Sequence, residues 1–235
     1  MIEDLARAPY DAFARPWERP LVPGDRVDRF EILREIGRGG FGVVYEALDP
    51  ELNRKIALKT LRPGRHRHEL SEEWLRREAD ATARLDHPAI VTVLDAGTCE
   101  RGPWMALELL RGETLQARLE RGRLSPREAL AVALEIAAGL AHAHDRGLLH
   151  RDLKPGNVFL TEGGRVKLLD LGLAHLVGTR GGGEGGTPAY MAPEQARGGE
   201  VDARADVFAL GAILFEMPAG ARPFEVRADR SAALD

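Results

Sequence analysis

The eight residues His150–Asn157, HRDLKPGN, decide how the rest of the chain is interpreted. They place a carboxylate at Asp152, an ammonium at Lys154 and an amide at Asn157 on one short stretch. The proline and glycine between the lysine and the asparagine favour a loop, because neither residue suits the interior of a helix or strand. The stretch therefore indicates a rigid turn that presents three functional groups to one cleft. The alternative is a solvated turn that happens to be charged.

Composition and charge limit the classes of protein to which this chain can belong. The chain has 235 residues, a net charge of −4 and a single cysteine, Cys99. Such a small charge does not indicate a nucleic-acid partner, and a lone cysteine favours a reducing compartment. No apolar run reaches the ~20 residues of a membrane span, and the start of the chain lacks the features of a signal peptide. We therefore expect a cytoplasmic protein with no membrane segment and no nucleic-acid partner.

A glycine-rich stretch lies between two expected strands near the start of the chain. Residues Phe30–Ile36 are strand-like, GRGGFG follows at Gly37–Gly42, and Val43–Ala47 resume strand character. A lone GxGxxG is a weak signal that dinucleotide-binding folds share, but in those folds the glycines open a helix. A glycine hairpin can instead lay backbone N–H groups over phosphates. An ordinary glycine hairpin remains the alternative.

Helical patterns dominate the second half of the chain. Ser125–Glu128 is a capping box with proline at the first helical position, and it predicts a helix that runs to about Arg146. His142 and His144 lie two positions apart on that helix and face different directions, so we interpret them as structural rather than as a metal pair. A further apolar helix is predicted at Val207–Met217.

Lysine is rare in this chain. It occurs at positions 55, 59, 154 and 167 among 33 basic residues. The planar guanidinium of arginine does not replace a compact ammonium in a tight phosphate site. The positions of Lys59 and Lys154 therefore favour a phosphate-binding role over chance placement.

Four motifs in sequence order resemble those of protein kinases. HRDLKPGN resembles the catalytic loop of the serine/threonine class, and Ile56–Lys59 is similar to the strand that carries the phosphate-binding lysine. Asp170–Gly172, DLG, resembles the metal-binding DFG element, and Gly186–Glu194 matches the substrate-docking end of the activation segment. By this resemblance, residues 28–224 are identified as a bacterial eukaryotic-like (Hanks-type) serine/threonine protein kinase.

The resemblance implies an α+β, two-lobed fold with ATP between the lobes. An extension would occupy residues 1–27, a small lobe with an antiparallel sheet and one helix residues 28–110, and a mainly helical large lobe residues 111–235. Because the large lobe of the family continues through further helices, the resemblance also implies a truncated lobe. Self-association or a partner would then have to cover the helix at 207–217.

The resemblance also assigns roles to individual residues. Asp152 would accept the proton of the substrate hydroxyl, and Lys154 would neutralise charge on the moving phosphoryl group. Lys59 would contact the α- and β-phosphates and pair with Glu78, on a helix predicted at Ser71–Leu85.

Metal and nucleotide would meet beside these groups. Asn157 and Asp170 would hold Mg²⁺, with Mn²⁺ as an alternative ion, because hard oxygen ligands suit both. The backbone of Glu108–Leu110 would bind the adenine edge, and apolar residues that could equally belong to the core would enclose the base. The expected nucleotide-binding residues are Ile36, Gly37, Gly39, Gly42, Val44, Ala57, Lys59, Glu108, Leu110 and Phe159.

Regulation and support are assigned in the same way. Thr179 or Thr187 would be the phosphorylated residue of the activation segment, and Arg151 would bind that phosphate. Thr187 would alternatively hydrogen-bond within the catalytic loop. Asp206 would anchor the backbone of this loop.

The expected function is ATP-dependent phosphorylation of serine and threonine hydroxyls on proteins, including autophosphorylation. One alternative is a catalytically impaired fragment that acts as a nucleotide-binding or regulatory interaction module. Another is a small-molecule kinase of related fold. Lys154 and the stretch 186–194 argue against a small-molecule kinase, because they suit an extended peptide substrate.

Overall fold

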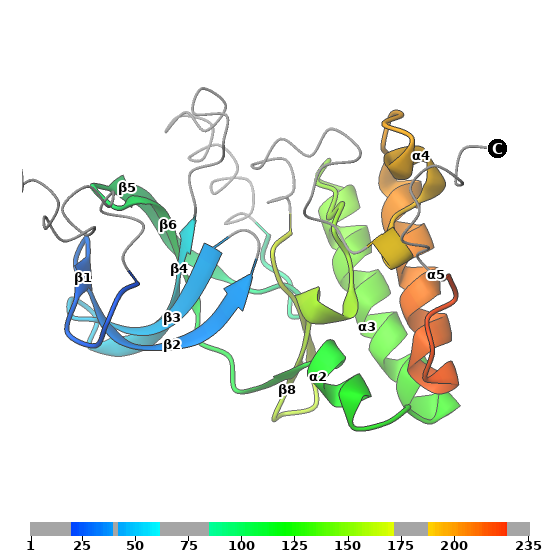
Figure 1. Ribbon diagram of the computed structural model, residues 1–235, viewed down its shortest axis with the longest axis horizontal. Helices are drawn as coiled ribbons and strands as arrows, with labels where there is room; N and C mark the ends of the chain where they lie inside the picture. Colours follow the sequence, from blue (N-terminus) through cyan, green and yellow to red (C-terminus); the bar gives the residue numbers. More distant parts are fainter. Residues whose placement is uncertain (1–19, 40–41, 62–84, 172–187, 225–235) are drawn as a thin grey trace, which may run out of the picture.

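The computed structural model describes residues 20–39, 42–61, 85–171 and 188–224. It consists of a sheet lobe and a helical lobe that lie side by side (Figure 1). The predicted α+β, two-lobed arrangement is therefore confirmed.

The sheet lobe contains six strands in the order β1-β2-β3-β4-β6-β5, with every neighbouring pair antiparallel. The strands are β1 (Arg26–Val27), β2 (Phe30–Gly39), β3 (Gly42–Asp49), β4 (Arg54–Leu61), β5 (Val93–Cys99) and β6 (Gly102–Glu108). The predicted glycine hairpin joins β2 to β3, where Gly39 pairs with Gly42. β1 lies just ahead of the domain boundary expected at residue 28.

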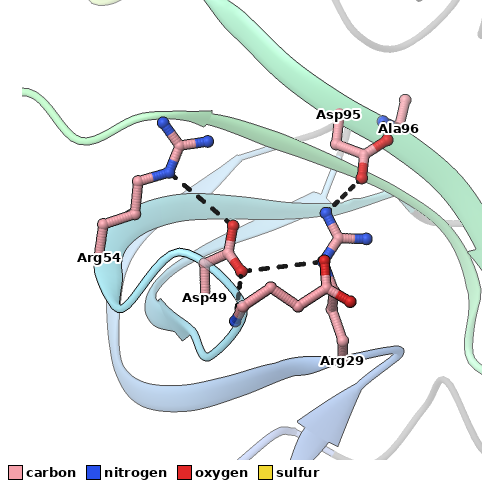
Figure 2. A network of polar contacts seen from close by, with 6 residues as sticks. Arg29, Asp49, Arg54, Asp95 and Ala96 are labelled. Carbon is pink, nitrogen blue, oxygen red and sulfur yellow. Dashed lines mark hydrogen bonds and ion pairs between the residues drawn. The ribbon is translucent and has the colours of Figure 1, made fainter.

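A polar network ties the first hairpin of this sheet to β5 (Figure 2). Arg29 donates a hydrogen bond to Asp95 at 2.5 Å, and its guanidinium lies 4.4 Å from the ring centroid of the buried Phe30. The hydrogen bond to Asp95 raises the pKa of Arg29 above its ordinary value, although burial acts in the opposite direction. Asp49, whose side chain is 2% exposed, lies 3.8 Å from both Arg29 and Arg54. The network holds the strand ends together, and so supports the strand that carries Lys59.

The helical lobe is built on two long helices that pack side by side (Figure 1). The helices of this lobe are α2 (Leu115–Glu120), α3 (Pro126–His144), α4 (Pro193–Ala196) and α5 (Ala203–Ala219), with 3₁₀ turns at Pro155–Asn157 and Pro188–Tyr190. The predicted capping box is confirmed, because Ser125 and Glu128 exchange both hydrogen bonds at the start of α3. The helix ends at His144, slightly before the predicted end, and Asp145 is its C-cap.

Apolar side chains line both the buried and the exposed faces of these helices. Ile136 and Ile213 are fully buried in the core that α3 and α5 share. Leu134 is 62% exposed on α3, and Val207 and Phe215 are 60% and 52% exposed on α5. The apolar helix expected at 207–217 thus begins four residues earlier, at Ala203, and presents part of its apolar surface to solvent. Within the part of the chain that the structure describes, no helix has the length and apolarity needed to cross a membrane.

A second, three-stranded sheet belongs to the helical lobe, and the stretch His150–Asn157 leads directly into one of its strands. Its strands are β7 (Gly112–Thr114), β8 (Val158–Thr161) and β9 (Val166–Leu168), in that order. Gly112 has a φ of +137°, and a Cβ there would collide with the carbonyl oxygen of Leu160, so only glycine fits. A parallel bridge between Ile90 and Leu168 joins β9 to the segment that precedes β5. The backbone therefore connects this sheet directly to the sheet lobe.

Candidate active site

The stretch His150–Asn157 forms the predicted turn between α3 and β8. The Nζ of Lys154 donates to Oδ2 of Asp152 at 2.7 Å. The amide of Asn157 donates to the carbonyl oxygen of Asp152 at 2.7 Å and to its Oδ2 at 3.1 Å. Asp152 is therefore in direct contact with both of the other predicted functional groups of the loop.

Asp206 anchors the backbone of this loop, as predicted. Its carboxylate, in a residue only 1% exposed, accepts hydrogen bonds from the backbone N–H of His150 and of Arg151, each at 2.8 Å. The Nε2 of His144 lies 2.8 Å from the same carboxylate. The contact agrees with a structural role for His144, but the sequence does not indicate this partner, because the two residues lie 62 positions apart. Hydrogen bonds to Asp206 thus link the end of α3 and the start of the loop to α5.

Two residues of the site have a backbone conformation that L-residues rarely adopt. Arg151 has a φ of 63° and Asp170 a φ of 56°, both in the left-handed region. Such strain persists where surrounding contacts determine the conformation. For Arg151 these contacts include the bond from its N–H to Asp206 and a bond from Gln195 Nε2 to its carbonyl oxygen at 2.9 Å.

Lys59 on β4 meets Asp170, which follows β9. The Nζ of Lys59 lies 2.5 Å from Oδ1 of Asp170, although the residues are 111 positions apart. Their side chains are 6% and 21% exposed, so the pair is largely withdrawn from solvent. The backbone N–H of Leu169 donates to the carbonyl oxygen of Asn157 at 2.9 Å. A continuous series of contacts therefore connects Lys59, Asp170, Asn157 and Asp152.

Several residues proposed for the nucleotide gather on one side of the sheet lobe. Val44, Ala57 and Leu110 belong to one apolar cluster, together with Leu107. Phe159 on β8 is half-buried, yet it belongs to none of the three apolar clusters formed by the described residues. The structure therefore groups three of these side chains and leaves Phe159 apart from them.

Packing within the described residues does not require glycine at positions 37 and 39 of the hairpin Gly37–Gly42, which we call the flap. A Cβ at Gly39 would meet no described atom within 4 Å, and at Gly37 the nearest would be Val44 Cβ at 3.9 Å. Neither glycine has a positive φ of the kind found at Gly112. Ile36, at the base of the flap, is 39% exposed. The described residues thus give no steric reason for glycine at positions 37 and 39.

The side chain of Glu108 makes polar contacts at the end of β6. Its Oε1 accepts hydrogen bonds from Lys167 Nζ at 2.5 Å and from the backbone N–H of Thr92 at 2.8 Å. Burial acts to raise the pKa of Glu108, but Lys167 and Thr92 outweigh it and hold that pKa below its ordinary value. The carboxylate is therefore ionised and already bonded to Lys167 and Thr92. Any contact of Glu108 with adenine would come from its backbone.

A small hollow opens beside the functional loop. The residues that line it include Asp152, Lys154, Tyr190, Met191 and Gln195. The hydroxyl of Tyr190 donates to Glu216 on α5 at 2.5 Å, and burial together with this bond raises the pKa of the phenol. The turn at Pro188–Tyr190 is thereby fixed to α5 next to Asp152.

Some predicted site residues lie outside the described part of the chain. They are Glu78, Thr179 and Thr187. Their assigned roles stay predictions.

Asn157 and Asp170 provide oxygen donors of the kind that Mg²⁺ prefers. Because the Nδ2 of Asn157 donates toward Asp152, its Oδ1 faces the opposite way and can act as a ligand. Mg²⁺ is commonly held by one or two protein ligands together with phosphate oxygens and water. In keeping with this, the described residues contain no cluster of three or more His, Cys, Asp or Glu side chains that would bind a metal alone. The donor set therefore fits a metal ion that arrives with a phosphate ligand.

With this geometry established, comparison with known proteins identifies the family. The family model for the protein kinase domain matches residues 30–234. The chain belongs to the protein kinase family, whose members use ATP and a divalent metal ion.

The most similar proteins include bacterial serine/threonine kinases and a solved kinase domain. The chain is 41% identical to serine/threonine-protein kinase PknL of Mycobacterium tuberculosis, over 87% of this chain and 53% of that protein. It is 42% identical to the DNA damage-responsive serine/threonine-protein kinase RqkA of Deinococcus radiodurans, over 90% of this chain and 33% of that protein. The crystal structure of the M. tuberculosis PknI kinase domain superposes with a TM-score of 0.73 at 33% identity, covering 88% of this chain and 80% of that one. The chain thus spans a third to about half the length of these two full-length relatives, and most of the solved kinase domain.

Proposed function

We propose that this chain transfers the γ-phosphoryl group of ATP to serine and threonine hydroxyls of proteins, its own included. The observation that carries the proposal is the contact between Lys59 and Asp170, next to the linked pair Asn157 and Asp152. These groups come from β4, from the segment after β9 and from the loop after α3, and their contacts support a single site with one cation and three oxygen-bearing groups. The serine/threonine preference is supported by the names of the relatives.

The proposed reaction uses each of these groups at a definite atom. Asp152 Oδ orients the substrate hydroxyl and receives its proton as the new oxygen–phosphorus bond forms and the bond to the ADP oxygen breaks. Lys154, 2.7 Å from Asp152, places positive charge beside the transferred group. Lys59 binds the phosphates farther from the reacting bond. Asn157 and Asp170 would hold Mg²⁺, which neutralises charge on the phosphate oxygens.

The proposed nucleotide pocket lies between the flap, Gly37–Gly42, and the segment Glu108–Leu110, which we call the connector. Val44, Ala57 and Leu110 form one apolar side of it, and Phe159, packed in no described core cluster, would form the other. The backbone N–H groups of the glycine flap would cover the phosphates. The peptide substrate would lie over the catalytic loop, with its hydroxyl directed at the carboxylate of Asp152.

An interaction module is the second candidate function. The exposed apolar residues Val207, Leu214 and Phe215 on α5 support it, because contiguous exposed apolar residues commonly mark protein contacts. Self-association or a partner protein would cover this face. Turnover of ATP separates this candidate from the first.

The proposal is tested by the binding of ATP in the presence of Mg²⁺, measured by calorimetry on the full chain. We expect Lys59→Met to weaken binding by about 10- to 100-fold, because it removes an ammonium from a largely buried phosphate site. Asp170→Asn should weaken binding only when Mg²⁺ is present. Lys55→Met is the matched control, because Lys55 lies four positions before Lys59 on the same strand, pairs with Glu46 and has a side chain that is 61% exposed. Unchanged binding in both site variants would reject the proposed cleft.

A glycine substitution in the flap separates ligand binding from folding. We expect Gly39→Ala to leave the melting temperature unchanged or slightly raised, because the added methyl group meets no described atom. Affinity for ATP should fall by about 3- to 10-fold, since a Cβ intrudes where the backbone is proposed to approach phosphates. Thermal unfolding and calorimetry on the same preparation give both values. A loss of stability without a loss of affinity would contradict this role.

A further inference from the structure

Three distant segments meet at a single carboxylate oxygen, Oε1 of Glu108. Lys167 Nζ donates to this oxygen at 2.5 Å and also to the carbonyl oxygen of Ile90 at 3.1 Å. The backbone N–H of Thr92 donates to the same Oε1 at 2.8 Å. The end of β6, the segment before β5 and strand β9 are thus joined through two side chains.

Backbone hydrogen bonds next to the ion pair join the same three segments. The N–H of Glu108 donates to the carbonyl oxygen of Thr92 at 3.0 Å. Ile90 and Leu168 form a parallel bridge, in which Val91 donates to Leu168 at 3.0 Å. The ion pair therefore lies across a backbone junction between the sheet lobe and the sheet of the helical lobe.

This pair differs from an ordinary surface salt bridge. The side chains of Lys167 and Glu108 are 16% and 29% exposed, and each makes a further hydrogen bond to backbone. Exposed pairs contribute little, whereas partly buried charges that lose a partner are costly. Arg165 and Glu135 provide a comparison on the same hairpin, because they pair at 3.1 Å with side chains 58% and 31% exposed. That second pair joins β9 to α3 within the helical lobe and does not reach the connector.

The ion pair stands between the two ends of the proposed nucleotide site. Glu108 directly precedes the connector residues Leu109 and Leu110, which would face adenine. Lys167 lies three positions before Asp170, which contacts Lys59 at the phosphate end. A change in the position of β9 relative to the connector would thus alter the spacing between the two ends.

We propose that Glu108 and Lys167 form an interlobe clasp that sets the distance between the adenine-binding connector and Asp170. The clasp rests on the proposed function, because it acts on the binding of ATP at both ends. Both are positioning residues: their side chains touch each other and the backbone, and their effect reaches the nucleotide through the spacing of the site. A ligand that occupies only the adenine end does not depend on that spacing.

The test compares the affinities of the full chain for Mg²⁺·ATP and for adenosine in the variants Glu108→Gln, Lys167→Met and the double variant. We expect each single variant to raise the Kd for Mg²⁺·ATP about 5- to 20-fold and that for adenosine less than about 2-fold. The double variant should be no weaker than either single one, because both remove the same contact. Lys167→Arg, which keeps a cation, should retain most of the affinity. Arg165→Gln should bind both ligands as the unaltered chain does.

Three results would overturn the clasp. The first is an unchanged Kd for Mg²⁺·ATP in both single variants, and the second is an effect in the double variant that equals the product of the two single effects. The third is an equal loss of affinity for ATP and adenosine together with a lowered melting temperature. The last result would indicate a purely structural pair. Failure of the unaltered chain to bind Mg²⁺·ATP would overturn the proposed function and the clasp with it. Normal binding that is insensitive to both substitutions would overturn the clasp alone.

Discussion

Asp206→Asn is expected to lower the free energy of unfolding by about 3–5 kcal/mol, because it disrupts a buried charge that accepts three hydrogen bonds. The donors are the N–H groups of His150 and Arg151 and the imidazole of His144. An asparagine has one acceptor oxygen in place of two, so its NH₂ group would face at least one of these donors. Urea unfolding followed by circular dichroism measures the loss.

Asp202 provides the matched control for this prediction on the same helix. Its side chain caps the N-terminus of α5 by accepting from Arg204 N, but it is 56% exposed. Asp202→Asn should change stability far less than Asp206→Asn, because water replaces the lost contacts. Equal losses in the two variants would contradict the anchoring role of Asp206.

Asp152→Asn is expected to lower kcat for phosphoryl transfer by about 10²- to 10⁴-fold, the usual contribution of a positioned base. The KM for ATP should change little, because Asp152 is proposed to act on the hydroxyl and not on the nucleotide. The fold should persist, since an asparagine side chain is close in shape to the aspartate it replaces, and the Asp152 side chain is partly solvent-exposed, at 14%. Steady-state kinetics with a serine- or threonine-containing peptide gives both constants.

The control for this second prediction is Asp145→Asn, an exposed acid at the end of α3. It has the same change in charge close to the loop in sequence and should leave kcat unchanged. A kcat in Asp152→Asn within about threefold of the unaltered value would remove Asp152 from the reaction.

Local sequence signals predicted local structure well. The capping box at Ser125–Glu128 fixed the start of α3 because both of its hydrogen bonds form within one turn. The glycine hairpin between β2 and β3 was predicted for the same reason, since turn chemistry is local. The anchoring role of Asp206 came from the family resemblance and is confirmed by its bonds to the loop backbone.

Contacts between distant residues could not be predicted in this way. Periodicity assigned residues 207–217 to a helix, but it does not say which face a neighbour covers, and Val207 and Phe215 are exposed. The ion pair between Glu108 and Lys167 spans 59 positions and depends on how two sheets meet. In the sequence, the only indication of Lys167 was the rarity of lysine. Each described lysine is in fact paired with a carboxylate: Lys55 with Glu46, Lys59 with Asp170, Lys154 with Asp152 and Lys167 with Glu108.

The central claim is that separate segments of the chain form one site where ATP faces a protein hydroxyl. Its most direct test is phosphate incorporation from γ-labelled ATP into the purified, folded chain, followed by identification of the phosphorylated amino acids. We predict Mg²⁺-dependent incorporation on serine or threonine by the unaltered chain, and a rate of incorporation about 10²- to 10⁴-fold lower in Asp152→Asn. Tight Mg²⁺·ATP binding without incorporation into the chain or an added protein substrate, or an undiminished rate of labelling in Asp152→Asn, would contradict it.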